Sequence, residues 1–182
     1  MFHDLALNIC LLVTLCWVQG MLMRYLDESR MVSQISAGVL FGTVCIIGMM
    51  IPLKAFEGLI FDGRTVVLSM AAFFGGPWVG GIAGAIASAF RLWLGGIGTT
   101  PGILNTITPV LMGLGYRYAH QHWRLPFNLA TLLVFGLLMQ GLQILNLSLL
   151  PDEVFALIKD HVLMPLLIVL LPATILFGLL LK

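Results

Sequence analysis

Two arginines border one long apolar stretch of this sequence. Arg64 and Arg91 stand at its ends, no charged residue lies between them, and Asp62 precedes the first arginine by two positions. Arginine is costly to hold near hydrocarbon, so arginines at such places indicate a functional site by default. The planar guanidinium group binds a carboxylate through two parallel hydrogen bonds. These residues therefore predict the binding of a small anion, provided that the fold brings both arginines to one place.

The tripeptide Gly75-Gly76-Pro77 decides whether the arginines can meet. In one continuous helix, Arg64 and Arg91 would lie about 40 Å apart, at opposite membrane faces. Proline removes a backbone donor and clashes with the preceding turn, although many membrane helices only kink there. We expect a helical hairpin, which would bring both arginines to the same side. A kinked single span is the alternative.

Small residues recur at every fourth position after the break. They are Gly76, Gly80, Gly84 and Ser88. Such a ladder lets membrane helices approach each other closely. Arg91 follows Ser88 by three positions and so lies on the same helical face. We expect Arg91 to point toward packed protein or a cavity; the alternative is an interfacial arginine that extends to the lipid headgroups.

Asp62 offers a second explanation for Arg64. A cation is unfavourable at the N-terminus of a helix, where Arg64 would stand. Either Asp62 neutralises Arg64, or a bound anion does so and also accepts the free N–H groups of that turn. The two explanations are compatible, so both residues are candidates for the site.

An irregular turn is expected after Arg91. It contains Gly95 and Gly96, and Thr99, Thr100 and Asn105 follow. Non-helical backbone at membrane depth is tolerated only where it is buried in protein or lines a cavity. The two threonines and the asparagine are therefore further candidates for hydrogen bonds to a ligand. An ordinary exposed loop explains them equally well.

Composition identifies an integral membrane protein. Of 182 residues, 60% are hydrophobic and 9% are charged, and the mean hydropathy is +1.06, whereas soluble domains carry roughly 25% charged residues. The net charge of +1 gives no reason to expect nucleic-acid binding. The cysteines show no CxxC spacing, and we find no pattern typical of a metal site, a cofactor or an enzyme active site. We therefore expect no cofactor and no enzymatic activity in this chain.

Six apolar segments reach or nearly reach the ~20 residues that cross a bilayer. They are residues 5–23, 32–53, 65–91, 102–119, 126–149 and 162–181. Short connections join them, which predicts an all-α membrane protein with a single domain over residues 1–182. The distribution of Lys and Arg places the Arg117–Arg124 loop and the C-terminus in the cytoplasm.

Polar residues also recur on the fifth segment, where Gln140, Gln143 and Asn146 follow one another at three-residue spacing. Hydrogen bonds between helices are the simplest explanation, and a pocket wall is the alternative. His120 and His122 lie in a basic, aromatic loop and are expected to anchor it at the membrane interface.

The landmarks between residues 62 and 96 resemble one family. They are the D-x-R sequence that ends at Arg64, the GP-x-x-G-x-x-x-G pattern from Gly76 to Gly84, and the R-x-x-x-GG pattern from Arg91 to Gly96. This set resembles the bacterial LytS-type five-transmembrane receptor domain. That domain is the membrane input module of sensor histidine kinases and diguanylate cyclases.

The resemblance implies a receptor in the bacterial cytoplasmic membrane whose last helix passes the signal to a cytoplasmic output domain. Such a domain is expected after Lys182, and family kinases and cyclases imply a homodimer. Some members recognise small carboxylates such as pyruvate, and Arg64 and Arg91 match the family's arginines. Some relatives place small polar or thiol residues after the glycine pair; this sequence does not clearly match them and has Gly102 and Asn105 in that region. More loosely, the glycine pattern is similar to that of substrate-binding subunits of energy-coupling-factor transporters, which suggests a helical fold with an outward-facing pocket.

Three functions follow from these observations. The leading hypothesis is sensing of a small carboxylate from the outer side. The alternative is transport, as a substrate-binding subunit or small permease. The third is a scaffold whose arginines only anchor to headgroups or pair with carboxylates.

Overall fold

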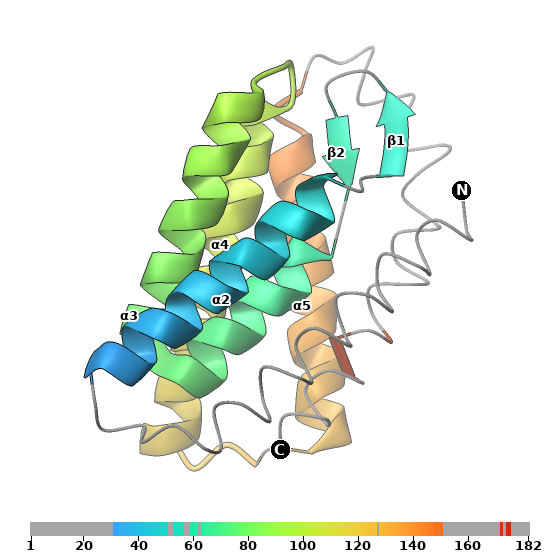
Figure 1. The fold of residues 1–182 in the computed structure, drawn as a ribbon. Coiled ribbons are helices and arrows are strands. Elements are labelled where there is room, and N and C mark those ends of the chain that lie inside the picture. The colour runs from blue at the N-terminus through green and yellow to red at the C-terminus, as the bar shows by residue number, and fades with distance from the viewer. Residues whose placement is uncertain are drawn as a thin grey trace.

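The computed structural model describes residues 31–50, 53–56, 59–61, 63–126 and 128–150, together with residues 172, 174 and 175. In chain order, its elements are α2 (Met31–Met50), β1 (Leu53–Phe56), β2 (Leu59–Phe61), α3 (Arg64–Leu94), α4 (Thr99–His122) and α5 (Leu129–Leu147). The helices lie side by side as a bundle (Figure 1). The predicted segments 5–23 and 162–181 lie outside this description, apart from those three residues.

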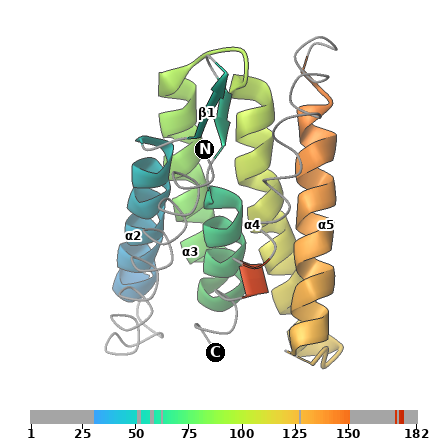
Figure 2. The same ribbon diagram turned by 90° about the vertical axis from the view of Figure 1, so that its right-hand side faces the viewer.

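Helix α3 reverses its direction at Gly76. This residue has φ 80° and ψ −167°, inside an element that is otherwise helical, and Pro77 follows it. A Cβ atom on Gly80 would lie 2.7 Å from Cβ of Ala72, whereas eight residues of continuous helix span about 12 Å. The two arms of α3, residues 64–75 and 77–94, are therefore antiparallel (Figure 2). The predicted break and hairpin are confirmed, and the single kinked span is wrong.

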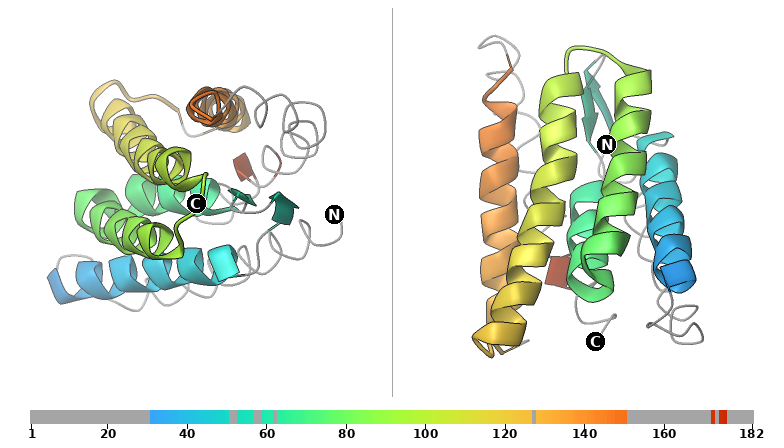
Figure 3. Two further views of the ribbon diagram at one scale, coloured as in Figure 1. Left: turned by 90° about the horizontal axis from the view of Figure 1, so that it is seen from above. Right: turned by 90° about the vertical axis from the view of Figure 1, so that its left-hand side faces the viewer.

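Small residues hold the neighbouring helices close to this hairpin. On α4, Val110 contacts the face of the second arm that carries Gly80 and Gly84, and Gly113 contacts the backbone of Ser69 on the first arm. On the other side, glycines of α2 pack against isoleucines of the second arm. Seen from above, α2 lies on one side of the α3 arms, and α4 and α5 lie on the other (Figure 3). The predicted role of the glycine ladder in close packing is confirmed.

The prediction of an all-α protein is confirmed for the bundle and needs one correction outside it. Strands β1 and β2 form an antiparallel pair with Leu53 opposite Phe61. They occupy the connection between α2 and α3. Isoleucine and phenylalanine, which occur in these strands, favour β-structure.

Three of the described helices, α2, α3 and α5, are long and apolar enough to cross a membrane. The reversal at Gly76 nevertheless folds the second arm of α3 back along the first, so that α3 is not one straight span (Figure 2). The described residues thus support a multi-pass helical membrane protein, but they do not show six spans.

Candidate functional site

Arg64 is the first residue of α3 and is 3% exposed. Its Nη1 atom donates a hydrogen bond to Sδ of Met49, near the end of α2, at 2.9 Å. This bond connects the start of the first arm to α2. Asp62, the predicted neutralising partner, lies outside the described residues.

Arg91 stands near the end of the second arm and is 1% exposed. Its Nη1 atom donates a hydrogen bond of 2.7 Å to the carbonyl oxygen of Gly95. Gly95 and Gly96 have φ values of 65° and 93°, which side chains with a Cβ atom rarely adopt. The prediction that Arg91 points into the protein is confirmed, and the alternative of an arginine extended to the headgroups is wrong.

Gly102 on α4 provides the surface against which Arg91 packs. A Cβ atom on Gly102 would lie 3.1 Å from Cδ of Arg91, and closer still to its Nε atom. Any other residue at this position would therefore displace the guanidinium group. The sequence indicated Gly102 only as a position where relatives place small polar residues, and its contact with Arg91 required the structure.

Arg64 and Arg91 lie at similar depth in the bundle. Ala72 and Gly80 contact each other across the hairpin, and Arg64 precedes Ala72 by eight residues. Eight residues beyond Gly80 comes Ser88, and Arg91 is three residues further, a rise of about 4.5 Å. The reversal thus places the two buried cations toward the end of the bundle at which the first arm begins and the second arm ends.

A buried polar cluster lies one helical turn beyond Gly102. Asn105 is 7% exposed, and its Oδ1 atom accepts a 2.8 Å hydrogen bond from Nδ2 of Asn146 on α5. The same amide group donates to Oγ1 of Thr108 at 3.3 Å. The predicted hydrogen bonding between helices is confirmed for Asn146. Thr108 was not predicted, although its position three residues after Asn105 places it on the same face of α4.

Gln143 follows on α5, one turn from Asn146 toward the other end of the bundle. Its side chain is 7% exposed, and among the described residues its Oε1 atom has no hydrogen-bond partner. A buried polar atom without a partner is costly, so this amide marks a place where a polar ligand group or water would be accommodated.

The two candidate threonines do not join this cluster. Thr100 is exposed, and the hydroxyl of Thr99 donates to the carbonyl oxygen of Gly96 at 2.7 Å. Both stand in the first turn of α4. Arg64, Arg91 and Asn105 are buried, whereas Thr99 is partly exposed and Thr100 is exposed.

The family model described as 5TMR of 5TMR-LYT matches residues 19–182, nearly the whole chain. The chain belongs to the 5TMR-LYT family. The 5TMR-LYT domain is a membrane sensory module of signalling receptors and is not catalytic. A search of curated proteins found no match, and neither did a search of solved structures.

The sequence landmarks of this 5TMR-LYT domain all fall on α3 and its two ends. The D-x-R pattern ends at the first residue of α3, Gly76-Pro77 forms the reversal, and the final glycine pair ends the second arm. The resemblance was therefore carried by the element that positions both arginines. The similarity to energy-coupling-factor subunits stays a prediction.

Arg117 has a structural role that we did not predict from the sequence. Its Nη1 atom donates to the carbonyl oxygens of Phe73 and Phe74, at 2.8 and 2.7 Å, and its guanidinium group lies over Gly76. The last carbonyls of a helix have no partner within it, and a cation there is favoured. Arg117 thus closes the end of the first arm. We had assigned it only to a basic loop.

Aromatic rings connect the same end of the hairpin to α4 and α5 in this 5TMR-LYT domain. Phe73 stacks on Tyr116 with ring centres 4.9 Å apart, and Tyr116 stacks on Phe135 at 5.1 Å. The Tyr116 hydroxyl donates to Oγ1 of Thr131 at 2.9 Å. A change at the hairpin turn can therefore reach α5 through two ring contacts.

Proposed function

We propose that this sensory domain binds a small carboxylate, such as pyruvate, between the arginine-bearing ends of α3. The observation that carries the proposal is the burial of Arg64 and Arg91 in the same half of the bundle. A carboxylate placed between two guanidinium groups would be attracted by both positive charges. A carboxylate also offers the planar geometry that arginine binds in bidentate fashion.

Asn105 and the neighbouring polar groups support the same location. Asn105, Asn146 and Gln143 supply amide donors and acceptors on the faces of α4 and α5 that meet there. Such groups fix the orientation of a small ligand within an otherwise apolar pocket. A keto or hydroxyl oxygen next to the carboxylate of the ligand would form hydrogen bonds with these amides.

Signalling would follow from two packings of the helices. A ligand shifts such an equilibrium only by its differential affinity for the two states, so one packing of the helices must bind the carboxylate more tightly than the other. We propose that the last helix passes this bias to a cytoplasmic histidine kinase or diguanylate cyclase in a homodimer. The site would open to the outer side of the bacterial cytoplasmic membrane. The family match favours this sensing role over transport.

Calorimetric titration of the purified domain with pyruvate and other short carboxylates tests the proposal. We expect saturable binding by the wild type and a loss of at least tenfold in affinity for Arg91→Gln and Arg64→Gln, since a charged hydrogen bond contributes roughly 1.5–3 kcal/mol. Arg124→Gln, which removes the same charge from an exposed position, is the matched control and should bind as the wild type does. Equal binding by Arg91→Gln would disprove the proposal.

A further inference from the structure

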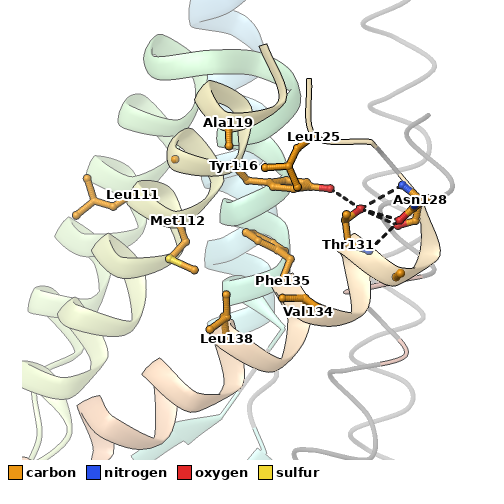
Figure 4. A pocket seen from close by; sticks show the side chains of 12 residues that line it. Leu111, Met112, Tyr116, Ala119, Leu125, Asn128, Thr131, Val134, Phe135 and Leu138 are labelled. Atoms are coloured by element: carbon orange, nitrogen blue, oxygen red, sulfur yellow. Dashed lines mark hydrogen bonds between the residues drawn. The ribbon is translucent and has the colours of Figure 1, made fainter. Parts of the chain in front are cut away.

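A groove of about 520 Å³ lies between α4 and α5, near the turn that joins them (Figure 4). Its walls are mostly apolar and include Leu111, Met112, Ala119, Val134, Phe135 and Leu138. Three of these residues, Leu111, Val134 and Leu138, are more than half exposed. The groove therefore opens sideways from the bundle. In a membrane protein, that side faces the hydrocarbon of the bilayer.

One end of the groove is polar. Tyr116, Thr131 and Asn128 line it, and their hydrogen bonds to one another face the α4–α5 turn (Figure 4). Trp123 in that turn is exposed, and tryptophan concentrates at the boundary between hydrocarbon and headgroups. The groove thus runs from the apolar part of the bundle to the membrane surface.

The turn at this polar end is basic. Arg124 precedes Leu125, which lines the groove, and is exposed. Its backbone adopts φ 50°, a conformation that residues other than glycine seldom adopt. His120 contacts the carbonyl oxygen of Leu125 at 2.6 Å. No acidic residue occurs in the sequence from position 63 to position 150, so the turn attracts anions.

We propose that this groove binds one acyl chain of an anionic phospholipid whose phosphate lies beside Arg124. An apolar groove that opens into hydrocarbon accommodates a chain, and basic pockets between membrane helices bind anionic headgroups. A neutral lipid would fill the apolar part equally well but would gain nothing at Arg124. The polar end and the charge of the turn therefore select the anionic headgroup.

Gly115 gives a direct way to block the groove. It lines the groove, and a Cβ atom built on it meets no other atom within 4 Å. Leucine at this position would fill the space without displacing a neighbour. Gly141 on α5 has equally open surroundings and does not line the groove, so Gly141→Leu is the matched control.

Native mass spectrometry of the full chain, released from vesicles of mixed phosphatidylglycerol and phosphatidylcholine, tests the proposal. We expect the wild type to retain phosphatidylglycerol in preference to phosphatidylcholine. Arg124→Gln should lose about fivefold of that preference, the effect of one arginine near an anionic surface, and Arg124→Lys should keep it. Gly115→Leu should lose bound lipid of both kinds, and Gly141→Leu should lose none.

Two results would overturn the proposal. One is retention of both lipids in equal amounts by the wild type. The other is unchanged lipid retention by Gly115→Leu together with a change in its oligomeric state, which would assign the groove to a second copy of the chain.

Discussion

Helix α4 packs against α3 on one face and α5 on another, and the two contacts differ in kind. Toward α3, a Cβ atom on Gly113 would collide with the backbone oxygen of Ser69. Toward α5, a Cβ atom on Gly115 meets nothing, and the groove of about 520 Å³ opens. Gly113 thus marks a close backbone contact, and Gly115, two positions later, marks an open surface. The comparison indicates that the α3–α4 pair is a fixed unit, and that α5 is the helix whose packing a ligand can shift.

The largest expected effect comes from replacing these glycines in parallel. Gly113→Leu should destabilise the domain by about 3 kcal/mol or more, because leucine cannot fit against a backbone that has no room to move. Gly115→Leu should leave stability unchanged or raise it slightly, since glycine is unfavourable inside a helix. Thermal unfolding in detergent measures both. A similar loss of stability in the two variants would show that the two faces of α4 are packed equally closely.

The second test concerns Arg117, which joins α4 to the end of the first α3 arm. Arg117→Gln should cost roughly 2–3 kcal/mol, because the carbonyl groups of Phe73 and Phe74 lose a charged donor. Arg124→Gln makes the same chemical change at an exposed position and should stay within about 0.5 kcal/mol of the wild type. Chemical denaturation of both variants compares them. An unchanged midpoint for Arg117→Gln would mean that the hairpin does not depend on this contact.

A smaller effect is expected where α4 supports Arg91. Gly102→Ala should lower carboxylate affinity about tenfold, a loss of ~1.4 kcal/mol, because the new methyl group displaces the guanidinium group. The domain should still fold, since the atom that must move belongs to a side chain rather than to the backbone. Calorimetry gives the affinity and circular dichroism checks the fold. Gly141→Ala is the control, and wild-type affinity for Gly102→Ala would show that the position of Arg91 does not matter.

The smallest effect concerns the contact of α4 with α5. Tyr116→Phe removes the hydrogen bond to Thr131 and keeps the ring stacking. We expect a loss of about 1 kcal/mol in unfolding free energy, the usual net contribution of one hydrogen bond. Hydrogen exchange should show faster exchange confined to α5, with α3 unaffected. Equal acceleration in both helices would mean that the two contacts of α4 are not independent.

Several features of the site could be predicted from the sequence because their causes are local. Glycine followed by proline in an apolar segment removes a hydrogen bond and permits a positive φ, so the break at Gly76 was predictable. The four-residue spacing of small side chains defines one helical face, and Arg91 continues it. Asn146 could be expected to bond across helices because amides in membrane spans need partners.

Other features depended on which segments pack together, and this could not be predicted from the sequence. Thr99 and Thr100 were candidates by proximity to Arg91 along the chain, yet Thr100 is exposed and Thr99 bonds to the carbonyl oxygen of Gly96. The pairing of β1 with β2 is likewise a contact between two segments of the chain. Neither outcome follows from periodicity or composition.

The sequence by itself determined an apolar helical membrane protein, the break in its third segment and the two arginines that border that segment. Only the tertiary structure decided that both arginines are buried in one half of the bundle and that Arg117 closes the other end of the hairpin. The physical reason is the range of the interactions. Backbone geometry and helical spacing act within a few residues, whereas the contact of Arg117 with Phe73 joins residues that are 44 positions apart. The sequence therefore cannot show that Gly113 lies against a backbone whereas Gly115 faces a groove.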